Sequence, residues 1–157
     1  MSYPQMKRPL SVTILVVLEL FYAVLGMVSG VILLADPSGA GLGFTSEVRD
    51  KIPFHSFFAV GLFLFAIYGL GSLLLAYGAW TRKELVFGRI SKAFGHHWSW
   101  IGGMALIGIL LIWLAVEGLL IGLDYPATYF TVAIGAAIFV ALLPRSTRKY
   151  LTAIKYT

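Results

Sequence analysis

Four long apolar stretches dominate the chain. They cover residues 10–35, 54–80, 98–123 and 127–143, and only two of them contain an acidic residue, Glu19 in the first and Glu117 in the third. A helix needs about 20 apolar residues to cross the hydrocarbon core of a bilayer, within a usual range of about 17–25. The pattern therefore predicts four transmembrane helices, the fourth of which is close to the minimum length.

The prolines support helices within these limits. All six stand at or outside the ends of the apolar stretches, at positions 4, 9, 37, 53, 126 and 144. Proline is tolerated in the first turn of a helix and disrupts its interior. We therefore expect an all-α fold, an integral membrane four-helix bundle, with residues 1–157 forming a single domain and the first stretch retained as a helix rather than cleaved as a signal peptide.

Basic residues gather on one side of the predicted helices. Ten of the 12 Lys and Arg residues lie before the first stretch, between the second and third, or after the fourth, and only Arg49 and Lys51 lie on the other side. An excess of Lys and Arg marks the cytoplasmic side. The sequence predicts a multi-pass protein of the cell membrane with both termini in the cytoplasm. The net charge of +5 then reflects topology, and nucleic acid is not an expected partner.

Composition excludes a soluble enzyme and a disordered chain. Hydrophobic residues make up 59% and charged residues 12%, with a mean hydropathy of +0.89, whereas globular domains carry roughly 45–50% and 25%. The absence of cysteine excludes disulfides, thiolate metal sites and thiol catalysis. The sequence contains no nucleophile–base pair, metal-ligand cluster or cofactor motif, so we expect no catalytic residue, no metal site and no cofactor.

The segment 81–97 is basic and aromatic. Phe87, Ile90 and Phe94 recur at i, i+3 and i+7, a spacing typical of a short amphipathic helix in the cytoplasmic headgroup layer. The tail after Pro144 has a similar composition. We expect contact with lipid headgroups or with a partner protein from Arg82, Lys83, Arg89, Lys92, His96, His97, Arg145, Arg148 and Lys149.

Glu19 and Glu117 are the acidic candidates for function, because a charge within the hydrocarbon region is costly and marks a functional site by default. Glu19 lies roughly 13 Å into its helix. Three interpretations stay open for it: a protonated group bonded within the core, a proton- or cation-binding site, and a contact with a partner subunit. Glu117 is expected near the outer interface, roughly 15 Å from Glu19 in depth, so that the two do not pair directly.

Small residues recur at helical spacing in the first three stretches, and two pairs of glycines form G-x-x-x-G motifs. Small side chains allow helices in a membrane to approach closely. The predicted helix-packing residues are Ala23, Gly26, Gly30, Ala66, Gly69, Gly118 and Gly122.

The opening RPLSVTILVVLEL, residues 8–20, resembles a widespread family of small prokaryotic membrane proteins, frequent in archaea, whose first helix follows an R-P-L-x-V-T-I-L-x-x-L-E-like pattern. Similar pieces are LAYGAW (75–80), HWSWIGG (97–103) and PRSTRKYL (144–151). The resemblance covers most of the chain, and the segment 85–95 is longer than the usual turn. The resemblance implies four transmembrane helices, and it supplies no function because the family has no settled activity.

Two functions stay open at this stage. The absence of catalytic chemistry and the several small-residue surfaces favour a non-enzymatic accessory or scaffold subunit, which forms a homo-oligomer or packs in a larger membrane-protein complex within the lipid bilayer. The alternative is a compact proton-coupled transporter that uses Glu19 as its protonatable site. The strong charge bias of the loops argues against the insertion in both orientations that small multidrug transporters show.

Overall fold

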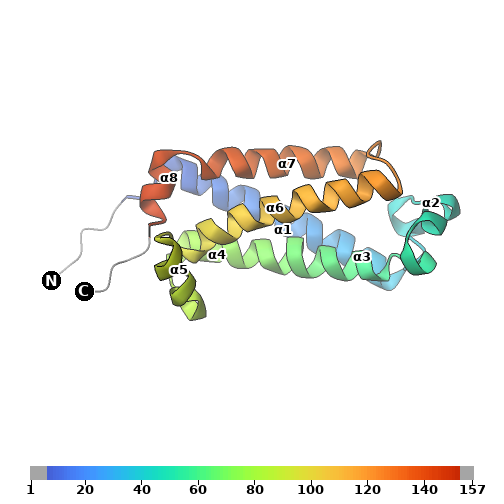
Figure 1. The fold of residues 1–157 in the computed structure, drawn as a ribbon, viewed down its shortest axis with the longest axis horizontal. Coiled ribbons are helices and arrows are strands. Elements are labelled where there is room, and N and C mark those ends of the chain that lie inside the picture. Colours follow the sequence, from blue (N-terminus) through green and yellow to red (C-terminus); the bar gives the residue numbers. More distant parts are fainter. Residues whose placement is uncertain (1–6, 153–157) are drawn as a thin grey trace.

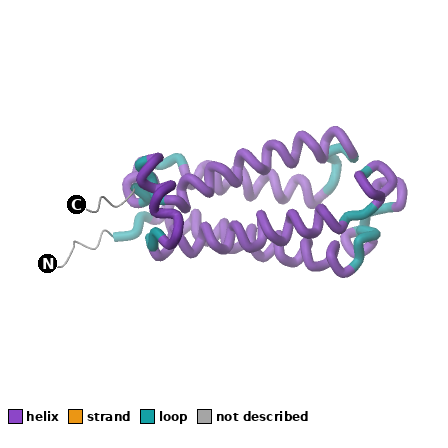
Figure 2. Tube along the Cα trace, turned by 60° about the horizontal axis from the view of Figure 1, so that its bottom comes forward, coloured by secondary structure: helices purple, strands orange, loops and turns teal. Residues whose placement is uncertain are grey.

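A computed structural model describes residues 7–152, and all regular secondary structure in that range is helical. Long helices run side by side and loops close the two ends (Figures 1 and 2). Helix α1 is Leu10–Ala35. A second long helix, Phe58–Thr81, consists of α3 (Phe58–Phe63), η3 (Leu64–Gly71) and α4 (Ser72–Thr81). Helix α6 is Trp98–Leu120, and α7 is Pro126–Leu142.

Three of these helices, α1, Phe58–Thr81 and α6, are long and apolar enough to cross a membrane. The fourth, α7, is also apolar but has 17 residues. The second helix begins four residues later than predicted, because Phe54 and His55 have φ values of 63° and 49° and a right-handed helix cannot include them. The third ends at Leu120 rather than at residue 123, shortly before Gly122, whose φ is 94°.

The helices pack in a ring in chain order. Helix α1 contacts the second long helix on one side and α7 on the other, and α6 contacts α4 and α7. Therefore α1 and α6 lie diagonally across the bundle. The middle of the second helix, η3, has the wider turns of a π-helix and forms the most extensive interface with α1. Wide turns of this kind are uncommon and frequently occur at functional sites.

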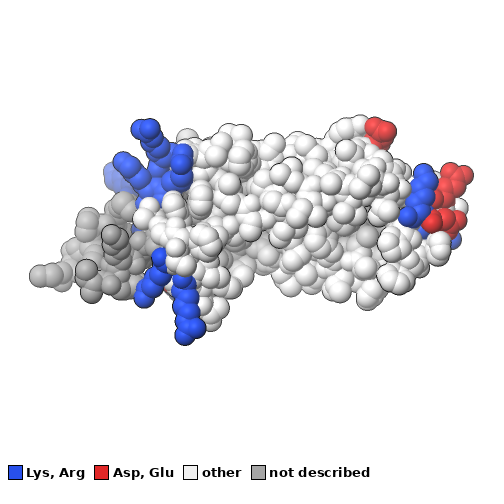
Figure 3. All heavy atoms as spheres, viewed as in Figure 1, with Lys and Arg blue, Asp and Glu red and all other residues white. Residues whose placement is uncertain are grey.

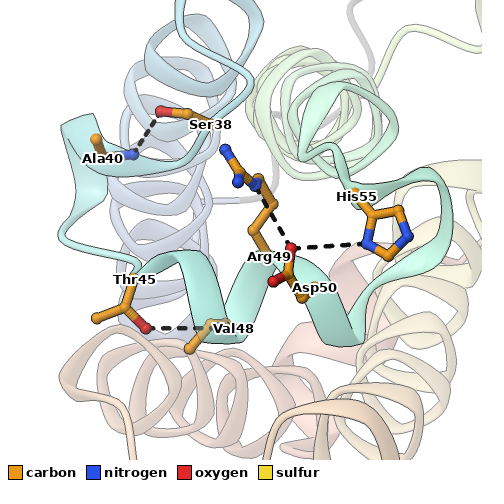
Figure 4. A network of polar contacts seen from close by, with 7 residues as sticks. All are labelled: Ser38, Ala40, Thr45, Val48, Arg49, Asp50 and His55. Carbon is orange, nitrogen blue, oxygen red and sulfur yellow. Dashed lines mark hydrogen bonds and ion pairs between the residues drawn. The ribbon is translucent and has the colours of Figure 1, made fainter.

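Short elements close both ends of the bundle. At one end lie η1 (Ala40–Leu42), α2 (Ser46–Lys51) and η2 (Pro53–His55). Thr45 accepts a hydrogen bond from the backbone N–H of Val48 and so caps α2, and Asp50 pairs with Arg49 at 3.9 Å and with His55 at 3.8 Å (Figure 4). At the other end lie η4 (Leu85–Phe87), α5 (Gly88–Phe94) and α8 (Arg145–Tyr150). The short helix predicted after the second stretch is α5.

Among the described residues, the exposed charged side chains lie at the two ends of the bundle. Figure 3 shows Lys and Arg side chains at the end that carries α5 and α8, and acidic side chains with a few basic ones at the end that carries α2. Between them, the visible surface has no charged group, and many large apolar side chains are exposed, among them Val17, Val28 and Ile112. An apolar belt between two charged ends matches the environment of a bilayer.

Candidate functional site

Glu19 is fully buried at the centre of the bundle, with 0% of its surface exposed. Its carboxyl group faces α6, where a Cβ atom built on Gly103 would lie 3.7 Å from Oε1 and 3.1 Å from Leu142 Cδ1 of α7. The carboxyl group therefore lies beside Gly103 at the point where α1, α6 and α7 meet, and a side chain at position 103 would crowd Leu142 rather than Glu19. Within residues 7–152, neither carboxyl oxygen has a hydrogen-bond partner.

Three further polar side chains are buried close to this level of the bundle: Tyr22 on α1, and Tyr68 and Ser72 on the second long helix. The two tyrosine rings lie 5.0 Å apart between centroids. Among the described residues, none of the three hydroxyl groups has a hydrogen-bond partner. Buried polar groups are normally paired, so this cluster is the most unusual chemical feature of the core.

The sequence did not single out these three residues, although a signal was present. Tyr22 follows Glu19 by three positions and Ser72 follows Tyr68 by four, so each pair shares one helix face. Each spacing is common among apolar helices, and only the packing of α1 against the second helix brings the two pairs together.

Glu117 lies towards the α2 end of the bundle, near the end of α6, and is half-buried. Thr128, in the first turn of α7, donates a hydrogen bond to its carboxylate. Glu117 therefore links the end of α6 to the start of α7. The two glutamates have different surroundings and do not form a carboxylate pair.

The glycines of α1 lie in a close helix–helix contact in which the backbones themselves approach each other. A Cβ atom on Gly26 would lie 2.6 Å from the backbone N of Gly69, and one on Gly30 would lie 2.7 Å from Phe65 Cβ. Ala23 is buried on the same face. The stripe Ala23–Gly26–Gly30 therefore packs within the chain, against the second long helix, and is not free to contact a partner.

Three predicted packing residues lie elsewhere. Ala66 is exposed on the outer face of the second helix, so it does not pack inside the bundle of this chain. Gly118 has only Leu123 of its own loop near its Cβ position, and Gly122 has no atom within 4 Å of that position. Gly122 also lies beyond α6 and has a left-handed backbone conformation. This second G-x-x-x-G motif therefore lies at the end of α6 rather than in a contact between two helices.

The basic end has its own buried cluster around His97, which is 0% exposed and precedes α6. Its Nδ1 accepts a hydrogen bond from the backbone N–H of Ser99, and its backbone N–H donates to the carbonyl of Leu151 at 2.7 Å. His97 thus caps α6 and holds the segment after α8. Because it is enclosed by protein, its prediction as a headgroup contact is wrong.

The other predicted contact residues lie around this cluster. His96 stacks on Trp100 with 4.5 Å between ring centroids, and the half-buried Arg82 lies over the ring of Tyr150 at 4.9 Å. Tyr150 is itself buried, so the end of α8 docks on the protein. The residues exposed on the surface of this end are Lys83, Arg89, Lys92, Arg145, Arg148 and Lys149.

Burial lowers the pKa of His97 below its usual range, against the opposing effect of Glu84 nearby. In the unfolded chain the pKa of histidine is about 6.5, so the unfolded chain binds a proton that the folded protein excludes. We expect the free energy of unfolding to fall as the pH drops below about 6.5. Asparagine is a good helix cap and does not titrate, so His97→Asn should reduce this dependence. Thermal unfolding in detergent at about pH 7.5 and about pH 5.5 measures the effect, and equal dependence in both proteins would contradict it.

No family model, curated protein or solved structure matches this chain. Within the described residues, no group of three or more His, Cys, Asp or Glu side chains is placed to hold a metal ion. The interpretation of the site therefore rests on its own geometry.

Proposed function

We propose that the chain is a four-span protein of the cell membrane with both termini in the cytoplasm. The separation of charge supports this topology, because most Lys and Arg residues lie at the α5–α8 end. Four crossings place Lys7 and Thr152, the first and last described residues, on the same side. Helix α7 has 17 residues, which is at the lower limit for a crossing of about 30 Å of hydrocarbon.

Its function, we propose, is that of a non-enzymatic accessory or scaffold subunit. The observation that carries this proposal is the outward face of α6, the least buried of the three long helices. Ala105, Gly108 and Ala115 are exposed there, and no atom lies within 4 Å of a Cβ position on Gly108. Small residues on an open face permit close approach of another helix. A second copy or a larger complex is the expected partner.

A leucine at position 108 tests this proposal. The position is open, so Gly108→Leu should leave the fold intact, while its side chain keeps a partner helix at a distance. We expect the association with a second copy or with a co-purifying protein to fall by at least about tenfold, the equivalent of a few lost close contacts. Cross-linking in native membranes and size-exclusion chromatography after mild solubilisation measure it. Gly108→Ala, which keeps a small residue, is the matched control. Unchanged association in Gly108→Leu would contradict the proposal.

A second candidate, the proton-coupled transporter, is favoured by the unpaired carboxyl group of Glu19 in the core. A carboxyl group buried within a membrane bundle is a candidate member of a proton or ion pathway. If the protein is a scaffold, Glu19→Gln should keep the shape of the side chain, and vesicles with wild type or with Glu19→Gln should show the same proton flux. Proton movement that is driven by a cation gradient in wild type and lost in Glu19→Gln would replace the scaffold by the transporter.

A further inference from the structure

A cavity of about 440 Å³ occupies the half of the bundle that carries α2. All four apolar helices and the loop around α2 line it, for example through Gly26, Val60, Trp113 and Thr131. Its size lies within the range of about 300–1,000 Å³ that small-molecule sites usually have. Glu19 does not line it, whereas Tyr22 and Tyr68 of the buried polar cluster do.

Aromatic side chains form much of its wall. Phe44 and Phe57 stack with 4.6 Å between ring centroids, and Phe63 stacks on Trp113 at 4.9 Å and so fixes the indole from behind. Aromatic rings attract cations through the negative potential of their faces, and cages of such rings recognise quaternary ammonium groups. The aromatic lining residues are Tyr22, Phe44, Phe54, Phe57, Tyr68 and Trp113.

Glu117 supplies the only carboxylate among the residues that line the cavity, and no Lys, Arg or His belongs to the lining. Thr128 also lines the cavity and donates a hydrogen bond to Glu117, which holds the carboxylate at this wall. Among the residues that line the cavity, the one acid and the aromatic ring faces therefore suit positive charge better than negative charge. The carboxylate disfavours an anionic occupant and favours a cationic one.

The cavity also reaches the surface. Two of its lining residues, Phe54 and Leu120, are 89% and 38% exposed. They lie at the α2 end of the bundle, in η2 and at the end of α6. A ligand can therefore enter the cavity at this end.

We propose that this cavity binds a lipophilic organic cation, whose charge contacts Glu117 and whose apolar groups fill the space between the aromatic rings. The site is independent of the proposed subunit function, because none of Ala105, Gly108 and Ala115 lines the cavity. A subunit that packs through α6 can hold such a ligand at the same time.

Binding of tetraphenylphosphonium to the full chain in detergent tests the proposal, with tetraphenylborate as an anion of the same shape. Titration calorimetry gives the affinity, and quenching of Trp113 fluorescence, judged against Trp113→Phe, reports the place of binding. We expect the cation to bind and to quench Trp113, and the anion to bind at least about tenfold more weakly. Glu117→Gln keeps a hydrogen-bond acceptor for Thr128 and should lower the affinity for the cation by at least about tenfold.

Two further variants complete the test. Asp124→Asn removes an exposed acid outside the lining and should leave the affinity unchanged. Ser29→Phe places a ring in the cavity from α1, keeps Glu117, and should abolish binding, so the proposal can be tested even if Glu117→Gln does not fold. Equal affinity for cation and anion would show a lipid-filled space without charge selection. That result, or unchanged cation binding in Glu117→Gln or Ser29→Phe, would overturn the proposal.

Discussion

A leucine at position 26 should force α1 away from the second long helix and remove most of the stability of the fold. At Gly26 the first side-chain carbon would already lie 2.6 Å from two backbone atoms, Gly69 N and Tyr68 C. Backbone atoms inside a helix cannot move aside as a flexible side chain can. Overpacking in a core usually costs about 1–3 kcal/mol, and here we expect the cost to exceed about 3 kcal/mol.

Gly108→Leu is the matched control, since it makes the same change at a position where no atom lies within 4 Å. Leucine is also the better helix former, so this variant should unfold at the wild-type temperature or slightly above it. The comparison is made by thermal or denaturant unfolding in a detergent that keeps the protein monomeric, so that a lost partner contact at position 108 does not contribute. If both leucines lowered stability equally, the contact between α1 and the second helix would not be the close one that the structure shows.

The helical fold follows from the sequence because its causes are local. Long apolar runs need internally satisfied backbone groups in a membrane, and only a helix provides these within one segment. Proline marks where such segments end. The second helix begins a few residues later than predicted, because the positive φ values of Phe54 and His55 depend on how the loop closes over the bundle.

The packing faces could be predicted only in part. Spacing places Ala23, Gly26 and Gly30 on one side of α1, but it does not say which way a mostly apolar helix is rotated. In a lipid environment, both faces of such a helix are apolar, so hydrophobicity gives no direction. Ala66 and Gly69 are both small residues of the second helix, yet Ala66 faces outward, whereas Gly69 lies at the contact with α1.

The cavity and the buried tyrosines were beyond prediction from sequence for a related reason. Tyr22, Tyr68, Trp113 and Thr128 come from four different helices, and only their packing brings them to one wall. Glu19 and Glu117 stand out in the sequence because acids are rare in apolar stretches. The side chains that surround them do not stand out, because hydroxyl and aromatic side chains are common in such helices.

Four crossings of the membrane are the central claim, and cysteine labelling tests it most directly. The chain has no cysteine, so each introduced thiol reports a single position. Ser46, Lys92 and Thr152 are exposed, the first at the α2 end and the other two near the basic end of the bundle. A membrane-impermeant thiol reagent is applied to intact cells and, separately, to permeabilised cells.

With both ends of the chain in the cytoplasm, the reagent should label Ser46→Cys in intact cells, and Lys92→Cys and Thr152→Cys only after permeabilisation. Helix α7 decides the outcome at Thr152, because the short helix must cross the bilayer to return the chain to the side of Lys92. Labelling of Thr152→Cys in intact cells, with Lys92→Cys still protected, would mean that α7 does not cross and would contradict the four-span topology.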